Sequence, residues 1–317
     1  MRNPHHRSML LLAALWLLLI VIFAAIRPAI LQPSMIQSVL QFSSMLALVG
    51  LGQALLILSG AGLDLSVGGM VSLTSILTML LVRAGVPAAL IPALALAIGL
   101  CLGLVNGVLV VNFRLLSLIA TLGSMFAYGG LALALTGGAT VSGVPSWLLP
   151  WGRGTLAGVP AHFLTTVVPA YLIAAAVLAL TPLGRWIFAM GNNERSARLV
   201  GIPVGRIRFT LYAISGLLSG LAGLISLAWF GSGRPDIGTN MELESLAAVL
   251  LGGVAIAGGR GGVGGVLAAV LLVVAVQAGL QYVNVSSSWQ LGLVGLLLIV
   301  ALTADRLPWG LRLRAKG

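Results

Sequence analysis

The sequence predicts an all-α polytopic membrane protein with about ten transmembrane helices, and three observations carry this prediction. The 317 residues are 59% hydrophobic and only 7% charged, whereas a soluble domain uses about 25% charged residues to cover its surface. Ten apolar segments are long enough, or nearly long enough, to cross a bilayer. The cations also fall mostly on one side of these segments. This composition argues against a soluble enzyme and excludes a disordered chain, because disorder needs low hydrophobicity and high charge.

The ten apolar segments can be taken in chain order. A helix crossing the hydrocarbon core needs roughly 20 apolar residues. The segments are approximately 9–31, 38–59, 66–83, 88–111, 115–136, 162–180, 209–230, 243–257, 263–283 and 289–305. We interpret 9–31 as a retained first span, because it is longer than a signal-peptide core and shows no clear cleavage site. The eighth segment is short, so we expect it to be partly buried in protein.

Ten spans place both termini on one side, and the positive charges make that side cytoplasmic. The inner segments then hold thirteen cations, namely Arg2, Arg7, Arg114, Arg185, Arg195, Arg198, Arg206, Arg208, Arg260, Arg306, Arg312, Arg314 and Lys316. The outer segments hold four, namely Arg27, Arg83, Arg153 and Arg234. One miscounted helix would scramble this asymmetry. We therefore interpret the net charge of +11 as the result of cations that set the orientation of the spans in the membrane. Scattered cations do not form the basic face of a nucleic-acid binder.

The chain is predicted to be a single transmembrane domain, 1–317, with two longer loops. The outer loop 137–161 contains Trp147 and Trp151, which we expect to anchor at the membrane interface. The inner loop 181–208 is the most polar stretch. A weak internal echo links SGAGLDLSVGG at 59–69 with GSGRPDIGTN at 231–240, on opposite membrane faces. It predicts inverted halves, helices 2–5 matched with 7–10, although two unrelated glycine-rich turns remain an alternative.

No motif for catalysis or nucleotide binding is visible. The three histidines, His5, His6 and His162, lie outside the centres of the spans, and the phosphate-binding sequence GxxxxGK[ST] is absent. ATP hydrolysis would therefore need another chain. The glycine-rich run 258–265 lies between two membrane helices, so a tight reversal explains it better than a nucleotide site. Glycines at four-residue spacing predict close helix packing; they are Gly99, Gly103 and Gly107 in one helix and Gly216 and Gly220 in another.

Polar side chains at membrane depth are costly and therefore informative. Gln53, Asp64, Ser66 and Asn106 are candidates for a translocation pathway, with Asp64 at a break between helices. A pathway of amides and hydroxyls suits a neutral polar solute better than a proton or a metal ion. For each residue, hydrogen bonding between helices remains the alternative role.

The inner loop predicts a short exposed helix of about two turns. Its signals are a cap at Asn192 or Asn193, a possible pair of Glu194 with Arg198, an apolar strip of Ala197 and Val200, and a stop at Gly201 and Pro203. A short helix held between two spans is suited to dock into a groove on a partner. The alternative is a solvated loop whose arginines only set the topology.

Three motifs carry a resemblance to a known family over nearly the full length. They are ILSGAGLDLSVGG at 57–69, GNNERSARLVGI at 191–202 and ESLAAVLLGGVAIAGGRGG at 244–262. The chain resembles the permease subunits of bacterial ABC importers of the ribose, xylose and galactose type. The second motif corresponds to the family's cytoplasmic coupling segment, with Ser196-Ala197 where the family commonly has Ala-Ala. Permeases for rhamnose and furanosyl autoinducers are also similar, and the sequence does not separate them.

The resemblance implies a transport subunit of the bacterial inner membrane that is not itself an enzyme and binds no cofactor. Its partners would be a cytoplasmic ABC ATPase carrying ATP and Mg²⁺, a periplasmic solute-binding protein, and a second permease copy or paralogue. The expected ATPase contacts are Asn193, Glu194, Arg195, Ala197, Arg198 and Gly201. Asp236, Glu242 and Glu244 are expected near the outer face, at a gate or a binding-protein contact. A self-sufficient secondary transporter is the alternative, but the spans hold almost no ionisable residues for coupling; a membrane-embedded enzyme lacks an acid–base pair.

Overall fold

The protein is described from a computed structural model, which covers residues 4–26, 32–286, 289–290, 292–293, 295–296 and 299. It is mostly helical. The helices are α1 (Pro4–Ile26), α2 (Pro33–Leu58), α3 (Val67–Arg83), the 3-10 helix η2 (Ala88–Leu90), α4 (Ile91–Gly107), the π-helix η3 (Val108–Asn112), α5 (Ser117–Thr136), α6 (Leu149–Arg153), the π-helix η4 (Phe163–Val167), α7 (Val168–Leu180), α8 (Pro182–Asn192), α9 (Glu194–Leu199), α10 (Val204–Phe230), α11 (Met241–Leu251) and α12 (Val263–Tyr282). Four two-residue strands complete it: β1 (Val141–Ser142), β2 (Thr155–Leu156), β3 (Val159–Pro160) and β4 (Ser232–Gly233).

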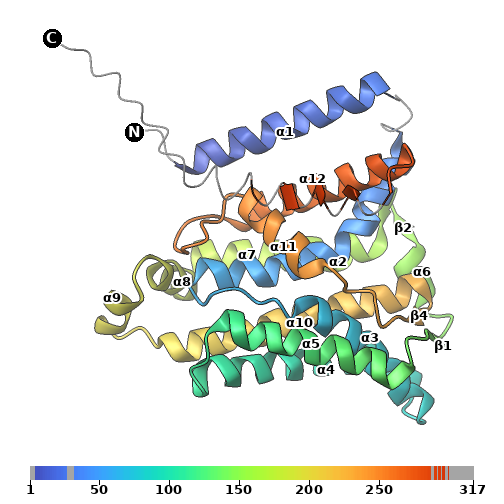
Figure 1. Cartoon of the computed structure of the whole chain (residues 1–317), viewed down its shortest axis with the longest axis horizontal. Helices are drawn as coiled ribbons and strands as arrows, with labels where there is room; N and C mark the ends of the chain where they lie inside the picture. The colour runs from blue at the N-terminus through green and yellow to red at the C-terminus, as the bar shows by residue number, and fades with distance from the viewer. Residues whose placement is uncertain are drawn as a thin grey trace.

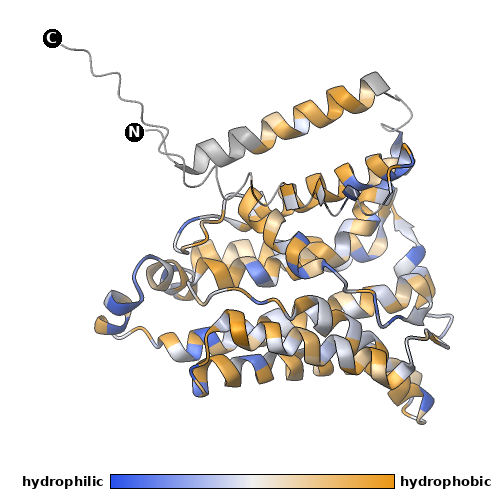
Figure 2. Cartoon of the chain, viewed as in Figure 1, coloured by the Kyte–Doolittle hydropathy of each residue, from blue (hydrophilic) through white to orange (hydrophobic). Residues whose placement is uncertain are grey.

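The long helices share one general direction and form a bundle with two distinct ends (Figure 1). Helices α8 and α9 lie at one end, which we call the α9 end. The strands and α6 lie at the opposite end, which we call the sheet end. Apolar residues dominate the helices between them, whereas polar residues gather at α9 and at the sheet end (Figure 2). This is the distribution that a bilayer around the middle of the bundle requires.

Six helical segments of the described chain are long and apolar enough to cross a membrane. They are Pro33–Leu58, Ala88–Asn112, Ser117–Thr136, Phe163–Leu180, Val204–Phe230 and Val263–Tyr282. Two shorter apolar helices, Leu12–Ala24 and Val67–Arg83, and the 11-residue α11 coincide with the remaining predicted segments before residue 289. The tenth segment, 289–305, falls largely outside the described residues, as do Arg2, Arg27, Arg306, Arg312, Arg314 and Lys316. The count of ten spans and the side of the termini therefore stay predictions.

Helices α2 and α10 form the centre of the bundle, and most of their residues are buried. Helix α4 crosses α10 where the predicted glycine faces meet. A Cβ on Gly99 would lie 2.6 Å from the Cα of Gly220, and a Cβ on Gly103 would lie 2.8 Å from the Cα of Gly216. The backbones thus touch directly, which confirms the predicted packing role of these glycines.

We expect Gly103→Ala to destabilise the protein by about 1–3 kcal/mol, because overpacking a close-packed contact forces helices apart. The added methyl would also collide with the backbone oxygen of Tyr212 in α10. The measurement is thermal unfolding of the purified chain in detergent. Gly123→Ala in α5 is the matched control, since a Cβ there meets nothing within 4 Å. Equal melting temperatures for the two variants would contradict the packing assignment.

Each of the two echo segments of the sequence contains a non-helical lead-in to a helix: residues 59–66 precede α3, and residues 234–240 precede α11. After α2 ends, the chain runs back along it, so that the backbone N–H of Asp64 donates to Oε1 of Gln53 at 3.2 Å. After β4, residues 234–238 run along α3: the hydroxyl of Ser75 donates to the carbonyl of Arg234 at 3.3 Å, and the N–H of Gly238 donates to the hydroxyl of Ser72 at 3.0 Å. Each segment is therefore held within the bundle, and the helix that follows it, α3 or α11, starts there.

The first turn of α3 meets the lead-in of α11 at a pair of glycines. A Cβ on Gly68 would collide with the carbonyl oxygen of Gly238, and a Cβ on Gly238 would collide with that of Gly68. Helices α3, with 17 residues, and α11, with 11, start near this contact. At 1.5 Å per residue, α11 is about 16 Å long, roughly half of the hydrocarbon thickness. Such broken helices are typical of inverted-repeat transporters, and the repeat itself remains a prediction.

The predicted outer loop 137–161 forms the sheet end. Strand β1 pairs antiparallel with β4, with Val141 opposite Gly233, so this loop is joined to the lead-in of α11. Strands β2 and β3 form a second antiparallel pair. Trp147 is 51% exposed, as an interface anchor would be. Trp151 is instead half-buried, and its Nε1 donates to the hydroxyl of Thr165 at 2.9 Å.

Candidate coupling surface and buried polar network

The α9 end is built by two consecutive short helices. Helix α8 begins where the hydroxyl of Thr181 accepts a hydrogen bond from the N–H of Gly184 at 3.4 Å, with Pro182 in the first turn. Helix α9 follows after one residue. The side-chain oxygen of Asn193 accepts from the N–H of Ser196 at 2.9 Å. Asn193 is therefore the helix cap, one of the two that the sequence left open.

Helix α9 ends at the predicted stop, although it is slightly shorter than expected. It holds six residues, which is about one and a half turns at 3.6 residues per turn. Gly201 follows with a φ of +83°, a conformation that favours glycine. Pro203 then leads into α10. The local signals in the sequence therefore placed this helix correctly.

Glu194 fixes α9 in two directions. Its Oε1 lies 2.7 Å from Nη2 of Arg198 within α9, as the four-residue spacing predicted. Its Oε2 lies 2.7 Å from Nη2 of Arg208 in α10, an ion pair that sequence spacing could not reveal. The side chain of Arg208 is only 18% exposed. The second pair therefore ties the exposed helix to α10, which is long and apolar enough to cross a membrane.

The apolar residues at the C-terminal end of α9 face in opposite directions. Ala197 is buried towards the bundle, whereas Leu199 is 82% exposed and Val200 is 76% exposed. The predicted strip of Ala197 and Val200 is thus divided between the inside and the surface. Sequence reasoning missed Leu199. Arg195 is exposed beside this apolar tip. An exposed apolar tip with arginines around it is the kind of surface that inserts into a partner's groove.

The ion pairs make the contribution of Glu194 to stability pH-dependent. Hydrogen bonds from Arg198, and secondarily from Arg208, hold the pKa of Glu194 below its ordinary value. A lowered pKa means that the contribution is present above the unfolded pKa of about 4.3 and is lost as the pH falls through the folded value. We therefore expect Glu194→Gln to lower the melting temperature slightly at pH 7, and we expect this difference to shrink as the pH is lowered from 7 towards 3. Melting curves in detergent across this range check it; a difference that grows on acidification would contradict it.

The four predicted pathway residues lie together in one buried network. Gln53, Asp64, Ser66 and Asn106 are all 0% exposed. Asp64 accepts from the hydroxyl of Ser66 at 2.6 Å and from its backbone N–H at 3.0 Å. The side-chain amide of Asn106 donates to the hydroxyl of Ser66 at 2.6 Å. Together with the Gln53 contact described above, these bonds hold the break between α2 and α3 against α4.

Residues from α5 and α10 complete the network and were missed by sequence reasoning. The hydroxyl of Ser215 donates to Oδ2 of Asp64 at 3.0 Å, and that of Tyr128 donates to Oδ1 of Asn106 at 3.3 Å. The hydroxyl of Thr121 accepts from the N–H of Leu65 at 3.1 Å. Four helices, α2, α4, α5 and α10, therefore converge on the short segment before α3. Asp64 is buried there with hydroxyl partners rather than a cation.

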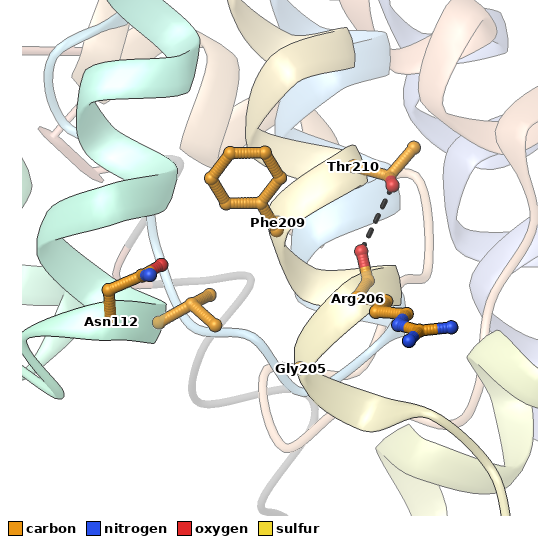
Figure 3. Close-up of a pocket in the computed structure, with 6 residues that line it drawn as sticks. Asn112, Gly205, Arg206, Phe209 and Thr210 are labelled. Atoms are coloured by element: carbon orange, nitrogen blue, oxygen red, sulfur yellow. Dashed lines mark hydrogen bonds between the residues drawn. The ribbon is translucent and has the colours of Figure 1, made fainter.

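A groove at the α9 end lies apart from this network. It has a volume of about 490 Å³ and lies between η3 and the start of α10. Figure 3 shows Asn112 and Phe209 facing across it, with the guanidinium of Arg206 directed away. Its lining is Val111, Asn112, Gly205, Arg206, Phe209 and Thr210. A second, apolar hollow of about 290 Å³ lies between α1, α2 and α12. The predicted pathway residues line neither of these two spaces.

The three acidic residues expected near the outer face are spread along the lead-in and first turn of α11. Asp236 is exposed and lies 3.4 Å from Arg234, next to the sheet end. The carboxylate of Glu242 lies against the first turn of α3, deeper in the bundle. Glu244 accepts a hydrogen bond of 2.9 Å from the side-chain amide of Gln277 in α12. Within residues 4–286 that are described, no group of three His, Cys, Asp or Glu side chains could hold a metal ion.

The structure describes the side chains of ten arginines, and these are unequally divided between the α9 end and the sheet end. Seven lie on segments of the α9 end: Arg114, Arg185, Arg195, Arg198, Arg206, Arg208 and Arg260. Three lie at the sheet end, where Arg83 donates to Ser142, Arg153 donates to Trp229 and Arg234 follows β4. The folded chain therefore keeps the charge asymmetry that the span count predicted.

Comparison with known proteins identifies the class. Residues 35–302 match the family described as branched-chain amino acid transport system / permease component. Because this match covers most of the chain, the protein belongs to that permease family, and it is a membrane transport subunit.

Individual relatives are similar over almost their whole length. The chain is 37% identical to the ribose import permease protein RbsC of Bacillus subtilis, covering 91% of this chain and 90% of the relative. It is 36% identical to RbsC of Escherichia coli K12, with 91% of each chain covered. It is 33% identical to the autoinducer 2 import system permease protein LsrD of Photorhabdus laumondii, covering 92% and 88%. No solved structure matches the chain.

Proposed function

We propose that this chain is the transmembrane permease subunit of an ATP-driven ABC importer that carries a monosaccharide or a similar small polar solute across the bacterial inner membrane. The ribose and autoinducer 2 permeases among its relatives support the solute class. The family match also favours this function over a self-sufficient secondary transporter. The sequence carries no phosphate-binding loop, so ATP and Mg²⁺ would bind to a separate ATPase.

The α9 end would face the cytoplasm and contact that ATPase. The excess of arginines at this end supports the orientation through the positive-inside rule. The ATPase contact would consist of Asn193, Glu194, Arg195, Ala197, Arg198 and Gly201, and we add Leu199 and Val200 as its apolar tip. ATP-driven closure of the ATPases would pull α9, and the Glu194–Arg208 ion pair would carry the movement into α10. The sequence supports ten spans, with the last within 289–305.

The other predicted sites receive different roles. The sheet end would face the periplasm, where Asp236 would contact a solute-binding protein and Glu242 and Glu244 would lie closer to the gate. Gln53, Asp64, Ser66 and Asn106 would act beside the pathway, by holding the start of α3 through their buried hydrogen bonds. A second permease copy or paralogue would complete the passage.

Affinity purification from native membranes tests this function. The chain should retain an ATPase in mild detergent. Leu199→Glu should lose it, because a charge at an apolar anchor opposes burial in a partner's groove. Arg185→Ala, an exposed arginine at the same end, should retain it. A chain that purifies without an ATPase and transports solute in ATP-free vesicles would instead be a secondary transporter.

A further inference from the structure

Three segments meet backbone to backbone at the α9 end. They are residues 57–60 at the end of α2, residues 190–192 at the end of α8, and residues 258–259 between α11 and α12. The N–H of Gly259 donates to the carbonyl of Leu58 at 2.9 Å. The side-chain amide of Asn192 reaches the carbonyl of Gly259 at 3.4 Å. We call these three segments the glycine junction.

The junction has no room for a side chain at its centre. A Cβ on Gly191 would collide with both the carbonyl oxygen of Leu58 and the backbone nitrogen of Gly259. A Cβ on Gly60 would lie 3.3 Å from the Cα of Gly191, and one on Gly258 would lie 3.1 Å from it. Gly60, Gly258 and Gly259 also have φ values of +68°, +85° and +72°, which disfavour any other residue. The three backbones therefore cannot slide past one another without breaking these contacts.

Each segment of the junction is continuous with a different element of the bundle. Residues 190–192 continue directly into Asn193 and α9. Residues 57–60 precede the lead-in that carries Asp64 to α3. Residues 258–259 connect α11 to α12. The junction therefore links the ATPase contact to α3 and to α11, because the first turn of α3 meets the lead-in of α11 at Gly68 and Gly238.

We propose that the glycine junction is a second transmission element of this permease, beside the Glu194–Arg208 ion pair: it moves with α8 and α9 as one rigid piece and so shifts the lead-in of α3 and the α11–α12 loop together. This inference rests on the proposed ATPase contact. It assigns a positioning role to Gly191, Gly259 and Asn192, which act through the helices they join and not by touching the solute.

Gly191→Ala tests the element in the complete importer reconstituted with its ATPase. The added methyl forces the three backbones apart, so transport should fall about tenfold, in the range of ordinary couplings between sites. ATPase binding and ATP hydrolysis should remain, because α9 is untouched. Gly264→Ala in the first turn of α12 is the matched control, since its Cβ would meet nothing within 4 Å. Gly191→Ala with full transport would overturn the proposal.

Hydrogen exchange on the unmodified importer decides the matter if Gly191→Ala does not accumulate. The Gly259 amide should stay protected in both the nucleotide-free and the ATP-trapped complex, because the junction moves without opening. Loss of this protection at residues 258–260 in either of the two states would overturn the proposal. Failure of the ATPase to bind the unmodified chain would instead refute the proposed function, which keeps the two failures distinct.

Discussion

Replacing Glu194 by alanine is expected to reduce solute uptake about tenfold, as loss of a typical coupling between two sites would. The change removes both ion pairs that orient α9, one to Arg198 and one to Arg208, each at 2.7 Å. Arg198→Glu should have the same effect, because it places two carboxylates four residues apart on one helix. Uptake of labelled solute by cells producing the whole importer is the measurement.

The amount of protein in the membrane separates coupling from folding in this experiment. The exposed pair of Glu194 with Arg198 contributes little to stability, about 0–1 kcal/mol, so Arg198→Glu should accumulate normally. Glu194→Ala also leaves the largely buried Arg208 without its carboxylate, so its uptake is compared at equal amounts of protein in the membrane. Arg185→Ala removes an exposed arginine from α8 at the same end and should transport normally. Unimpaired uptake by both Glu194→Ala and Arg198→Glu would show that α9 does not couple to the ATPase.

Asp64→Ala is expected to lower the stability of the chain by at least about 2 kcal/mol. The substitution removes the acceptor of two buried hydroxyls, those of Ser66 and Ser215, and each unsatisfied buried donor costs roughly 1–3 kcal/mol. Thermal unfolding of the purified chain in detergent measures the loss. Asp64→Asn keeps the shape and one acceptor oxygen, so it should lose less. A melting temperature unchanged by Asp64→Ala would contradict the structural role of the network.

These two predictions differ in how far the sequence could anticipate them. The cap at Asn193, the pair of Glu194 with Arg198 and the stop at Gly201 depend on residues within one or two turns, so spacing along the chain was enough to predict them. The partner of Glu194 in α10 and the exposure of Leu199 depend on how α9 is held against the bundle. Chain spacing carries no information about that arrangement.

The buried network shows the same limit at longer range. Polar residues at membrane depth could be singled out from the sequence, since each needs a partner there. Their partners lie on other helices: Ser215 is 151 residues from Asp64, and Asn106 is 40 residues from Ser66. Pattern analysis could therefore name Gln53, Asp64, Ser66 and Asn106 but could not show that they bind one another. The contact between Gly191 and Gly259 escaped it for the same reason.

Transport by sealed vesicles tests the central claim most directly. The chain is reconstituted with its ATPase and solute-binding protein, and uptake of labelled solute is compared with and without ATP on the ATPase side. We predict uptake that requires both ATP and the ATPase, and that falls about tenfold with Glu194→Ala. Uptake by the chain alone, without ATP and unaffected by Glu194→Ala, would contradict the account.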